Sequence, residues 1–132
     1  MVDSLDHVAI AVRSIDEALP LYRDVLGLDL LGFEEVPTQK VKVAVLSAGQ
    51  TRIELLEPVS PESPVQKYLD KNGEGLHHIA FRSEGIEAEL DRLDRAGIRL
   101  VDRSPRPGAE GARIAFLHPK ATGKVLIELV ER

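Results

Sequence analysis

The sequence LDHVAI at residues 5–10 returns in closely similar form as LHHIAF at residues 76–81, an offset of 71 residues. Farther along, DVLGLDL at residues 24–30 aligns with DRAGIRL at residues 94–100, an offset of 70. Because both matches keep the same order at nearly the same offset, they indicate that one unit of sequence is present twice.

A third match extends the repeat to the end of each copy. RIELLE at residues 52–57 aligns with LIELVE at residues 126–131, an offset of 74. Two copies are too few to stack as a solenoid, which needs at least three repeats. We therefore expect two modules that pair about a pseudo-twofold axis.

The hydrophobic pattern gives each module the order strand, helix, strand, strand, strand. Val8, Ile10 and Val12 alternate with His7 and small residues, and this period of two indicates a strand. In each module the first strand is followed by a charged segment whose apolar residues recur at helical spacing, which predicts a helix. A glycine suited to a helix C-terminus ends each segment. The expected strands are 5–12, 29–36, 40–48 and 51–57, then 76–82, 98–102, 112–118 and 125–131, with helices at 14–26 and 84–96.

A proline-rich connector separates the modules, and Ser63 with Pro64 is a typical start for a short helix that ends near Gly73. The fold class expected is α+β: two βαβββ modules whose curved mixed sheet forms an open barrel. The whole chain, 1–132, is predicted to be a single domain. Its parts are module one at about 3–57, a linker at 58–74 and module two at about 75–132.

The composition excludes several classes of function. The 132 residues carry a formal net charge of −5 and no basic run, so nucleic acid is not expected as a partner. No apolar stretch approaches the ~20 residues of a membrane-spanning helix, and no secretory signal is recognisable. A cytoplasmic location is expected. With no cysteine, a metal would have to be held by imidazole, carboxylate, amide or water.

Each module places a histidine in its first strand and a glutamate in its last, His7 with Glu54 and His78 with Glu128. A twofold axis would bring these equivalent positions together. Two buried carboxylates side by side repel unless a cation separates them. The four residues therefore predict a site for one divalent metal ion such as Co, Mn, Ni, Mg or Zn, with Co or Mn favoured.

A structural role remains the alternative for each of these residues taken alone, because a strand histidine is often only hydrogen-bonded. His77 has the opposite strand parity to its neighbour and is expected to face away from the site. His118, which precedes a proline, is expected to close a turn. Glu57 and Glu131 are expected to be solvated strand ends.

Several stretches resemble the vicinal oxygen chelate superfamily, which includes glyoxalase I and extradiol dioxygenases, and within it the methylmalonyl-CoA epimerase family. The resemblance covers essentially the whole chain, and the GLHHIAF and FLHPK stretches are its most specific parts. The similar stretches are DHVAIAV at 6–12, LYR at 21–23, IELLEP at 53–58, GLHHIAF at 75–81 and FLHPK at 116–120.

The resemblance implies the same four metal ligands and an isomerase that epimerises (2R)- and (2S)-methylmalonyl-CoA. Proton abstraction at the α-carbon would give an enolate, with Glu128 as a base. Members of the family commonly carry a second glutamate in the loop after the second strand, where this chain has Thr38. The second proton-transfer group is therefore not identified by the resemblance.

Two other functions fit the same pattern. One is a glyoxalase I-like isomerase of the lactoylglutathione lyase type, and the other is a non-enzymatic protein of this superfamily that binds small molecules. Exposed strand edges favour a homodimer. If the substrate is an acyl-CoA, the phosphates of the coenzyme need basic partners. The candidate basic residues are Arg103, Arg106, Arg113, Lys120 and Lys124.

Overall fold

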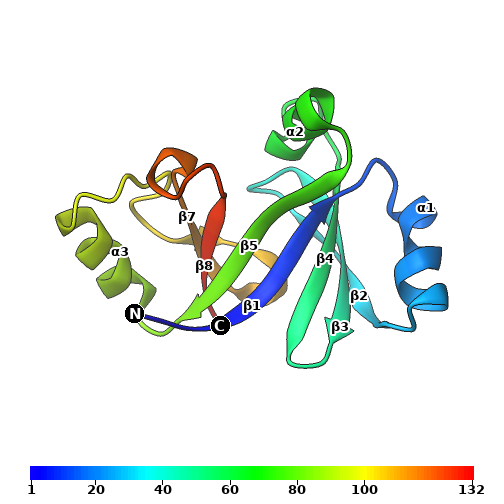
Figure 1. Ribbon diagram of the computed structural model, residues 1–132, viewed down its shortest axis with the longest axis horizontal. Coiled ribbons are helices and arrows are strands. Elements are labelled where there is room, and N and C mark those ends of the chain that lie inside the picture. Colours follow the sequence, from blue (N-terminus) through cyan, green and yellow to red (C-terminus); the bar gives the residue numbers. More distant parts are fainter. The chain divides into compact units, whose positions relative to one another are not determined.

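The computed structural model describes residues 1–132 and divides into two compact units (Figure 1). The N-terminal unit is His7–His77, and the C-terminal unit combines Met1–Asp6 with His78–Arg132. The first and fifth strands each cross the boundary between the units. No helix in the structure has both the length and the apolar character needed to cross a membrane.

The N-terminal unit contains a sheet in the order β2-β3-β4-β1. β1 runs parallel to β4, whereas β4 with β3 and β3 with β2 are antiparallel. These pairings confirm the strands predicted for module one, and a helix at Pro64–Asn72 confirms the short helix predicted in the linker. The elements are β1 Val2–Ala11, α1 Ile15–Leu19, η1 Pro20–Val25, β2 Asp29–Val36, β3 Val41–Ala48, β4 Thr51–Pro58 and α2 Pro64–Asn72.

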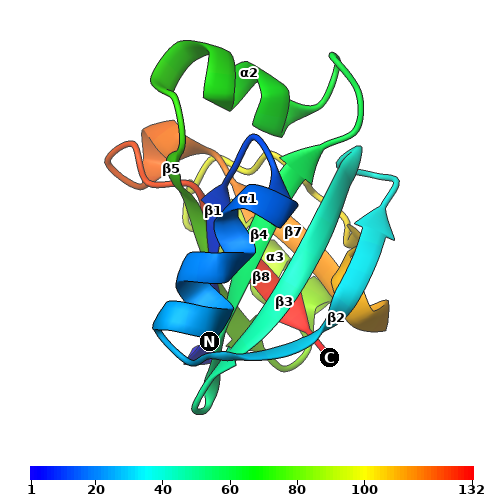
Figure 2. The ribbon, with the colours of Figure 1, turned by 90° about the vertical axis from the view of Figure 1, so that its right-hand side faces the viewer.

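Helix α1 packs on one face of this sheet (Figure 2). Its buried Ile15 and Leu19 contact Val12, Leu46 and Leu55, which are themselves nearly inaccessible to solvent. Because side chains alternate along a strand, the residues between these apolar positions point to the opposite face. His7 and Glu54 lie on that opposite face.

Pro20 divides the predicted 14–26 helix in two. α1 ends at Leu19, and a π-helical turn follows from Pro20 to Val25. In this turn the amide of Leu26 donates to the carbonyl of Leu21 at 2.9 Å, one residue farther back than in an α-helix. Proline has no amide hydrogen and its ring clashes with the preceding turn, so the chain widens at this point.

The C-terminal unit has the strand order β5-β8-β7-β6, with β5 parallel to β8 and the other pairs antiparallel. Helix α3 packs through Ile86 and Leu90 against Ala115, Leu117 and Leu129 of the sheet. This repeats the arrangement of the N-terminal unit. The elements are β5 Gly75–Ser83, α3 Ile86–Arg95, β6 Arg106–Pro107, η2 Ala109–Gly111, β7 Arg113–Leu117, η3 Pro119–Ala121 and β8 Ile127–Glu131.

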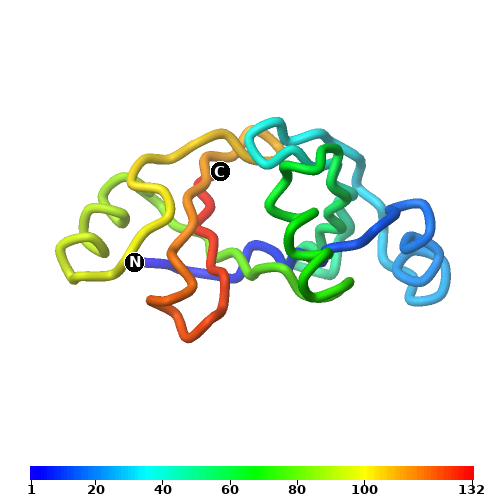
Figure 3. Tube along the Cα trace, turned by 90° about the horizontal axis from the view of Figure 1, so that it is seen from above, coloured from blue at the N-terminus to red at the C-terminus, as the bar shows by residue number.

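The strand predicted at 98–102 is wrong. This segment runs as an irregular connection from α3 toward β7, seen in yellow in Figure 3, and forms a single bridge between Leu100 and Leu117. The Asp102 carboxylate accepts the Phe116 amide at 2.9 Å, so a side chain takes the place of a backbone acceptor. The regular ladder ends there, and only the two-residue β6 continues at this edge.

Candidate metal centre

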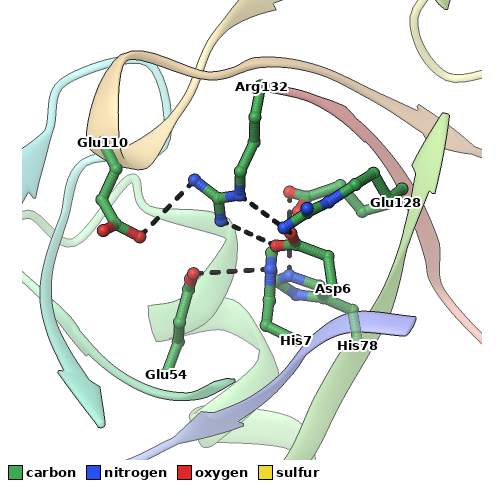
Figure 4. Close-up of polar contacts among 8 residues, drawn as sticks. Asp6, His7, Glu54, His78, Glu110, Glu128 and Arg132 are labelled. Carbon is green, nitrogen blue, oxygen red and sulfur yellow. Dashed lines mark hydrogen bonds and ion pairs between the residues drawn. The ribbon is translucent and has the colours of Figure 1, made fainter. Parts of the chain in front are cut away.

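The N-terminal unit brings His7 and Glu54 together on the sheet face opposite α1. Ala9, two residues after His7, is the register partner of Glu54 in the parallel β1–β4 pair. His7 Nδ1 lies 3.4 Å from Glu54 Oε2 (Figure 4). His7 is 3% exposed and Glu54 is 4% exposed. Sequence and register together place an imidazole nitrogen and a carboxylate oxygen side by side in the interior.

The C-terminal unit repeats this pair with His78 and Glu128. Ala80, two residues after His78, is the register partner of Glu128 in the parallel β5–β8 pair. His78 Nε2 lies 3.7 Å from Glu128 Oε2, and both residues are buried. The ring of His78 also meets the edge of Phe116, with the ring centres 5.2 Å apart. This contact packs the imidazole against a buried ring of the same unit.

The donor atoms of both pairs fit a divalent cation. Neutral imidazole nitrogen and carboxylate oxygen are ligands for first-row transition metals and, through the oxygens, for Mg²⁺. A charge-assisted N–H···O bond is typically about 2.8 Å long, and both nitrogen–oxygen distances exceed that length. Neighbouring ligands of one ion have this wider spacing, because each points at the ion and not at the other.

Asp6, immediately before His7, is a buried acid that the sequence did not single out. Its carboxylate receives two hydrogen bonds from Arg132, at 2.8 and 2.7 Å, and a third from Arg82 at 2.8 Å. Arg132 also lies 3.5 Å from Glu110 (Figure 4). All four residues belong to the C-terminal unit. Two guanidinium groups offset the cost of burying the Asp6 charge, and they tie the strand before His7 to the end of the chain.

The prediction that Glu57 and Glu131 are solvated strand ends is wrong. Glu57 Oε1 accepts the amide of Ile15 at 2.7 Å, and Glu131 Oε2 accepts the amide of Ile86 at 2.9 Å. Each glutamate thus satisfies an amide at the first residue of its own unit's helix. The amides at a helix N-terminus lack intrahelical partners and carry partial positive charge, so a carboxylate stabilises them.

The remaining histidines take structural positions. His77 is half-buried, its ring meets the edge of Tyr68 at 5.2 Å, and burial lowers its pKa to about 4. His118 is the N-cap residue immediately before η3, and its Nδ1 accepts the amide of Lys120 at 3.1 Å, which confirms the predicted turn. Burial is the largest cause of the lowered pKa of His118, followed by the charges of Arg99 and Lys120.

Three of the five basic residues considered for phosphate binding face carboxylates. Arg113 pairs with both Glu87 and Glu131. Arg106 lies 3.3 Å from Asp102 and over the ring of Phe116. The third, Arg103, lies 3.4 Å from Asp94. Their positive charges are therefore largely compensated within the C-terminal unit, and this weakens their candidacy as phosphate ligands.

Comparison with known proteins agrees with this architecture. Residues 6–116 match the family model of the glyoxalase/bleomycin resistance protein/dioxygenase superfamily. The ethylmalonyl-CoA/methylmalonyl-CoA epimerase of Cereibacter sphaeroides is 40% identical over 98% of this chain and 98% of its own. The crystal structure of methylmalonyl-CoA epimerase from Mycobacterium tuberculosis is 41% identical, with a TM-score of 0.95 over 98% of this chain and 88% of that one.

A further methylmalonyl-CoA epimerase structure, solved in complex with methylmalonyl-CoA and NH4+, is 37% identical. It aligns with a TM-score of 0.95 over 99% of this chain and 95% of that one. Paired modules with a strand histidine and a strand glutamate in each agree with the match to the glyoxalase/bleomycin resistance protein/dioxygenase superfamily. The chain belongs to that superfamily and, within it, to the methylmalonyl-CoA epimerase family.

Proposed function

We propose that this chain is an epimerase that interconverts (2R)- and (2S)-methylmalonyl-CoA by removing and returning the proton on the α-carbon. The observation that carries the proposal is the full-length match to a structure holding methylmalonyl-CoA, at 37% identity and a TM-score of 0.95. The buried histidine–glutamate pair in each unit supplies the chemistry that such a reaction needs.

The proposal includes one divalent cation held by His7, Glu54, His78 and Glu128, with Co or Mn favoured over Ni, Mg and Zn. The two imidazoles are neutral donors and the two carboxylates are anionic, a set that suits these ions. When bound, the cation supplies positive charge that stabilises the enolate oxygen of the substrate. The duplication supports this arrangement, because the two pairs occupy equivalent positions of the two modules.

Glu128 is the proposed base on one side of the substrate. Glu128 is 2% exposed and its carboxylate lies beside His78, so water competes little for its lone pairs. The α C–H bond breaks as its proton passes to a Glu128 oxygen, and the electron pair moves into the thioester carbonyl. Returning a proton to the opposite face of the flat enolate gives the other epimer.

The partners proposed are an acyl-CoA substrate and a second copy of the chain, with the protein acting in the cytoplasm. Lys120 and Lys124 lie in the turn before β8 and are the candidates for the phosphates of the coenzyme. The exposed Leu31 and Phe33 on the edge strand β2 support the homodimer, because apolar edge residues favour association.

The experiment is deuterium incorporation. Methylmalonyl-CoA of one configuration is incubated in deuterated water with the cobalt-loaded protein, and the α-carbon is followed by NMR. We expect label at that carbon together with the appearance of the second epimer. A His78→Ala variant, which lacks one metal ligand, is the matched control and should label slowly. The absence of label with the loaded wild-type protein would end the proposal.

A further inference from the structure

We propose that Arg106 is a positioning residue for His78. It holds the ring of Phe116 against the imidazole and thereby fixes the direction in which His78 presents its ring nitrogen to a cation. The inference rests on the proposed function, because it takes His78 as a metal ligand. It concerns side chains of the C-terminal unit alone.

One face of the C-terminal sheet carries the side chains concerned. Phe116 pairs directly with Glu128 across the antiparallel β7–β8 ladder. Glu128 pairs with Ala80, and His78 is two residues before Ala80 on the same strand. Residues that pair directly project to the same side of a sheet, and so do residues two apart on one strand. The ring of Phe116 therefore lies on the face that carries the histidine–glutamate pair.

The rings of Phe116 and His78 are packed together in the interior. Their centres are 5.2 Å apart and their planes meet at 88°, which is a favoured arrangement of two aromatic rings. Phe116 is 5% exposed and His78 is 4% exposed. Neither ring can turn in such a close-packed interior without displacing its neighbours. The orientation of the imidazole therefore depends on the orientation of the phenyl ring.

Arg106 lies over the same phenyl ring. Its guanidinium carbon is 5.5 Å from the centre of the Phe116 ring. Arg106 pairs with Ile114 across the β6–β7 ladder, so Phe116, two residues farther along, is its diagonal neighbour on the same face. A cation is attracted to the negative face of an aromatic ring. This attraction stabilises the orientation in which Phe116 presents its face to Arg106.

Asp102 holds the arginine and the phenylalanine at the same time. One of its carboxylate oxygens lies 3.3 Å from Nε of Arg106, and the other accepts the amide of Phe116 at 2.9 Å. The side chains of Arg106 and Asp102 are 30% and 17% exposed, so water screens this ion pair only in part. The carboxylate thus fixes the guanidinium beside the strand that carries the ring.

The equivalent position of the N-terminal unit carries a different side chain. Val45 pairs with Glu54 in the way that Phe116 pairs with Glu128. A valine has no aromatic face for an arginine, so this support belongs to the C-terminal pair. That pair includes the proposed base, and a base must be closely aligned with the C–H bond that it breaks. The support stands where alignment has the largest effect on rate.

The first test compares cobalt binding by Arg106→Met, Arg106→Lys and Arg95→Met. Methionine removes the charge but keeps much of the length of the side chain, whereas lysine restores a cation. Arg95, which pairs with Asp91 on α3 and is 79% exposed, is the matched control. Titration with cobalt alone, followed by absorbance, should show about 10-fold weaker binding in Arg106→Met. Arg106→Lys should recover part of this loss, and Arg95→Met should bind as the wild-type protein does.

A second measurement reports the ring contact in the metal-free protein. The ring protons of His78 lie beside the phenyl ring, whose ring current shifts their NMR signals by an amount that depends on the orientation of the two rings. Arg106→Met should move these chemical shifts toward those of Phe116→Leu, which lacks the ring. A loss of overall stability alone would leave the shifts of the folded protein unchanged.

The double variant Arg106→Met with Phe116→Leu separates action through the ring from any other route. It should bind cobalt no more weakly than Phe116→Leu alone, because the effect of Arg106 requires the ring. Additive losses of affinity, or unchanged His78 shifts in Arg106→Met, would overturn the assignment. If the wild-type protein binds no cobalt, the proposed metal site itself fails, and the His78 shifts still decide whether Arg106 positions the imidazole.

Discussion

The two units share their parallel strand pair but differ in the strands beside it. In each unit the first strand and the last strand carry a histidine and a glutamate in identical register, and a glutamate near the end of the last strand holds the first amide of the helix. Beyond that pair, the N-terminal unit has the eight-residue strand β2, whereas the C-terminal unit has only the two-residue β6.

This difference shows which parts of the fold the site constrains. The shared parts hold the buried histidine–glutamate pair and the helix packed behind it, so both copies keep them. The outer strands have no ligand to present, and they are free to serve separate tasks. In the N-terminal unit β2 is a regular eight-residue strand, and in the C-terminal unit the corresponding chain is irregular and rich in ion pairs.

The sharpest test of whether Glu54 and Glu128 are equivalent is to remove the charge of each in turn. Glu128→Gln should lower kcat by about 10³-fold, because an amide retains an oxygen ligand but cannot accept the α-proton. Glu54→Gln should lower kcat by only about 10-fold, since Glu54 is proposed as a ligand and not as a base. Steady-state kinetics at saturating cobalt, with metal content measured for each variant, makes the comparison.

Equal losses in Glu54→Gln and Glu128→Gln would contradict this asymmetry and assign the two carboxylates the same role. Both variants are isosteric, and each should unfold at a temperature close to that of the wild-type protein. A variant with lost metal and unchanged fold would indicate that charge is needed for coordination at that position.

A second comparison concerns Asp6 and His77, which occupy equivalent positions of the repeat. Asp6 is buried and bonded to Arg82 and Arg132, so Asp6→Ala leaves Arg82 without this acid and Arg132 with Glu110 still beside it, and should cost about 3 kcal/mol. His77→Ala removes a half-buried ring that contacts Tyr68, with no buried ion cluster around it, and should cost about 1 kcal/mol. Urea denaturation measures the free energy of unfolding of both variants. Equal losses in His77→Ala and Asp6→Ala would show that the ion cluster around Asp6 is not what stabilises this position.

The sequence predicted much of this structure because the repeat carries strong local signals. Alternating apolar residues located the strands, and the two buried histidine–glutamate pairs followed from their equivalent positions. Asp6 was missed because its partners, Arg82 and Arg132, are distant in the sequence and no local pattern joins them. The 98–102 strand failed for a related reason, since the Asp102 carboxylate replaces a backbone acceptor only after folding.

The smallest effect is expected where the two units match most closely, at the glutamates that hold the helix amides. Hydrogen bonds from Arg113, then from the amide of Ile86, lower the pKa of Glu131 below its ordinary value of 4.5. A lowered pKa in the folded state contributes stability above pH 4.5, and that contribution disappears as the pH falls through the lowered value. Glu131→Gln should therefore lower Tm by a few degrees at pH 7, and its difference from wild type should shrink in acid.

Glu57→Gln is the matched variant, since Glu57 holds the amide of Ile15 in the same way but has no equivalent of Arg113 in its hydrogen bond. Its effect on Tm should be smaller than that of Glu131→Gln, because a hydrogen bond from a guanidinium is lost in one variant only. Thermal unfolding followed by circular dichroism between pH 3 and 7 compares the two directly. If the Tm difference between Glu131→Gln and wild type grows as the pH falls, the lowered pKa of Glu131 does not contribute to stability as proposed. Protonation of the carboxylate must remove the stability that its charge contributes.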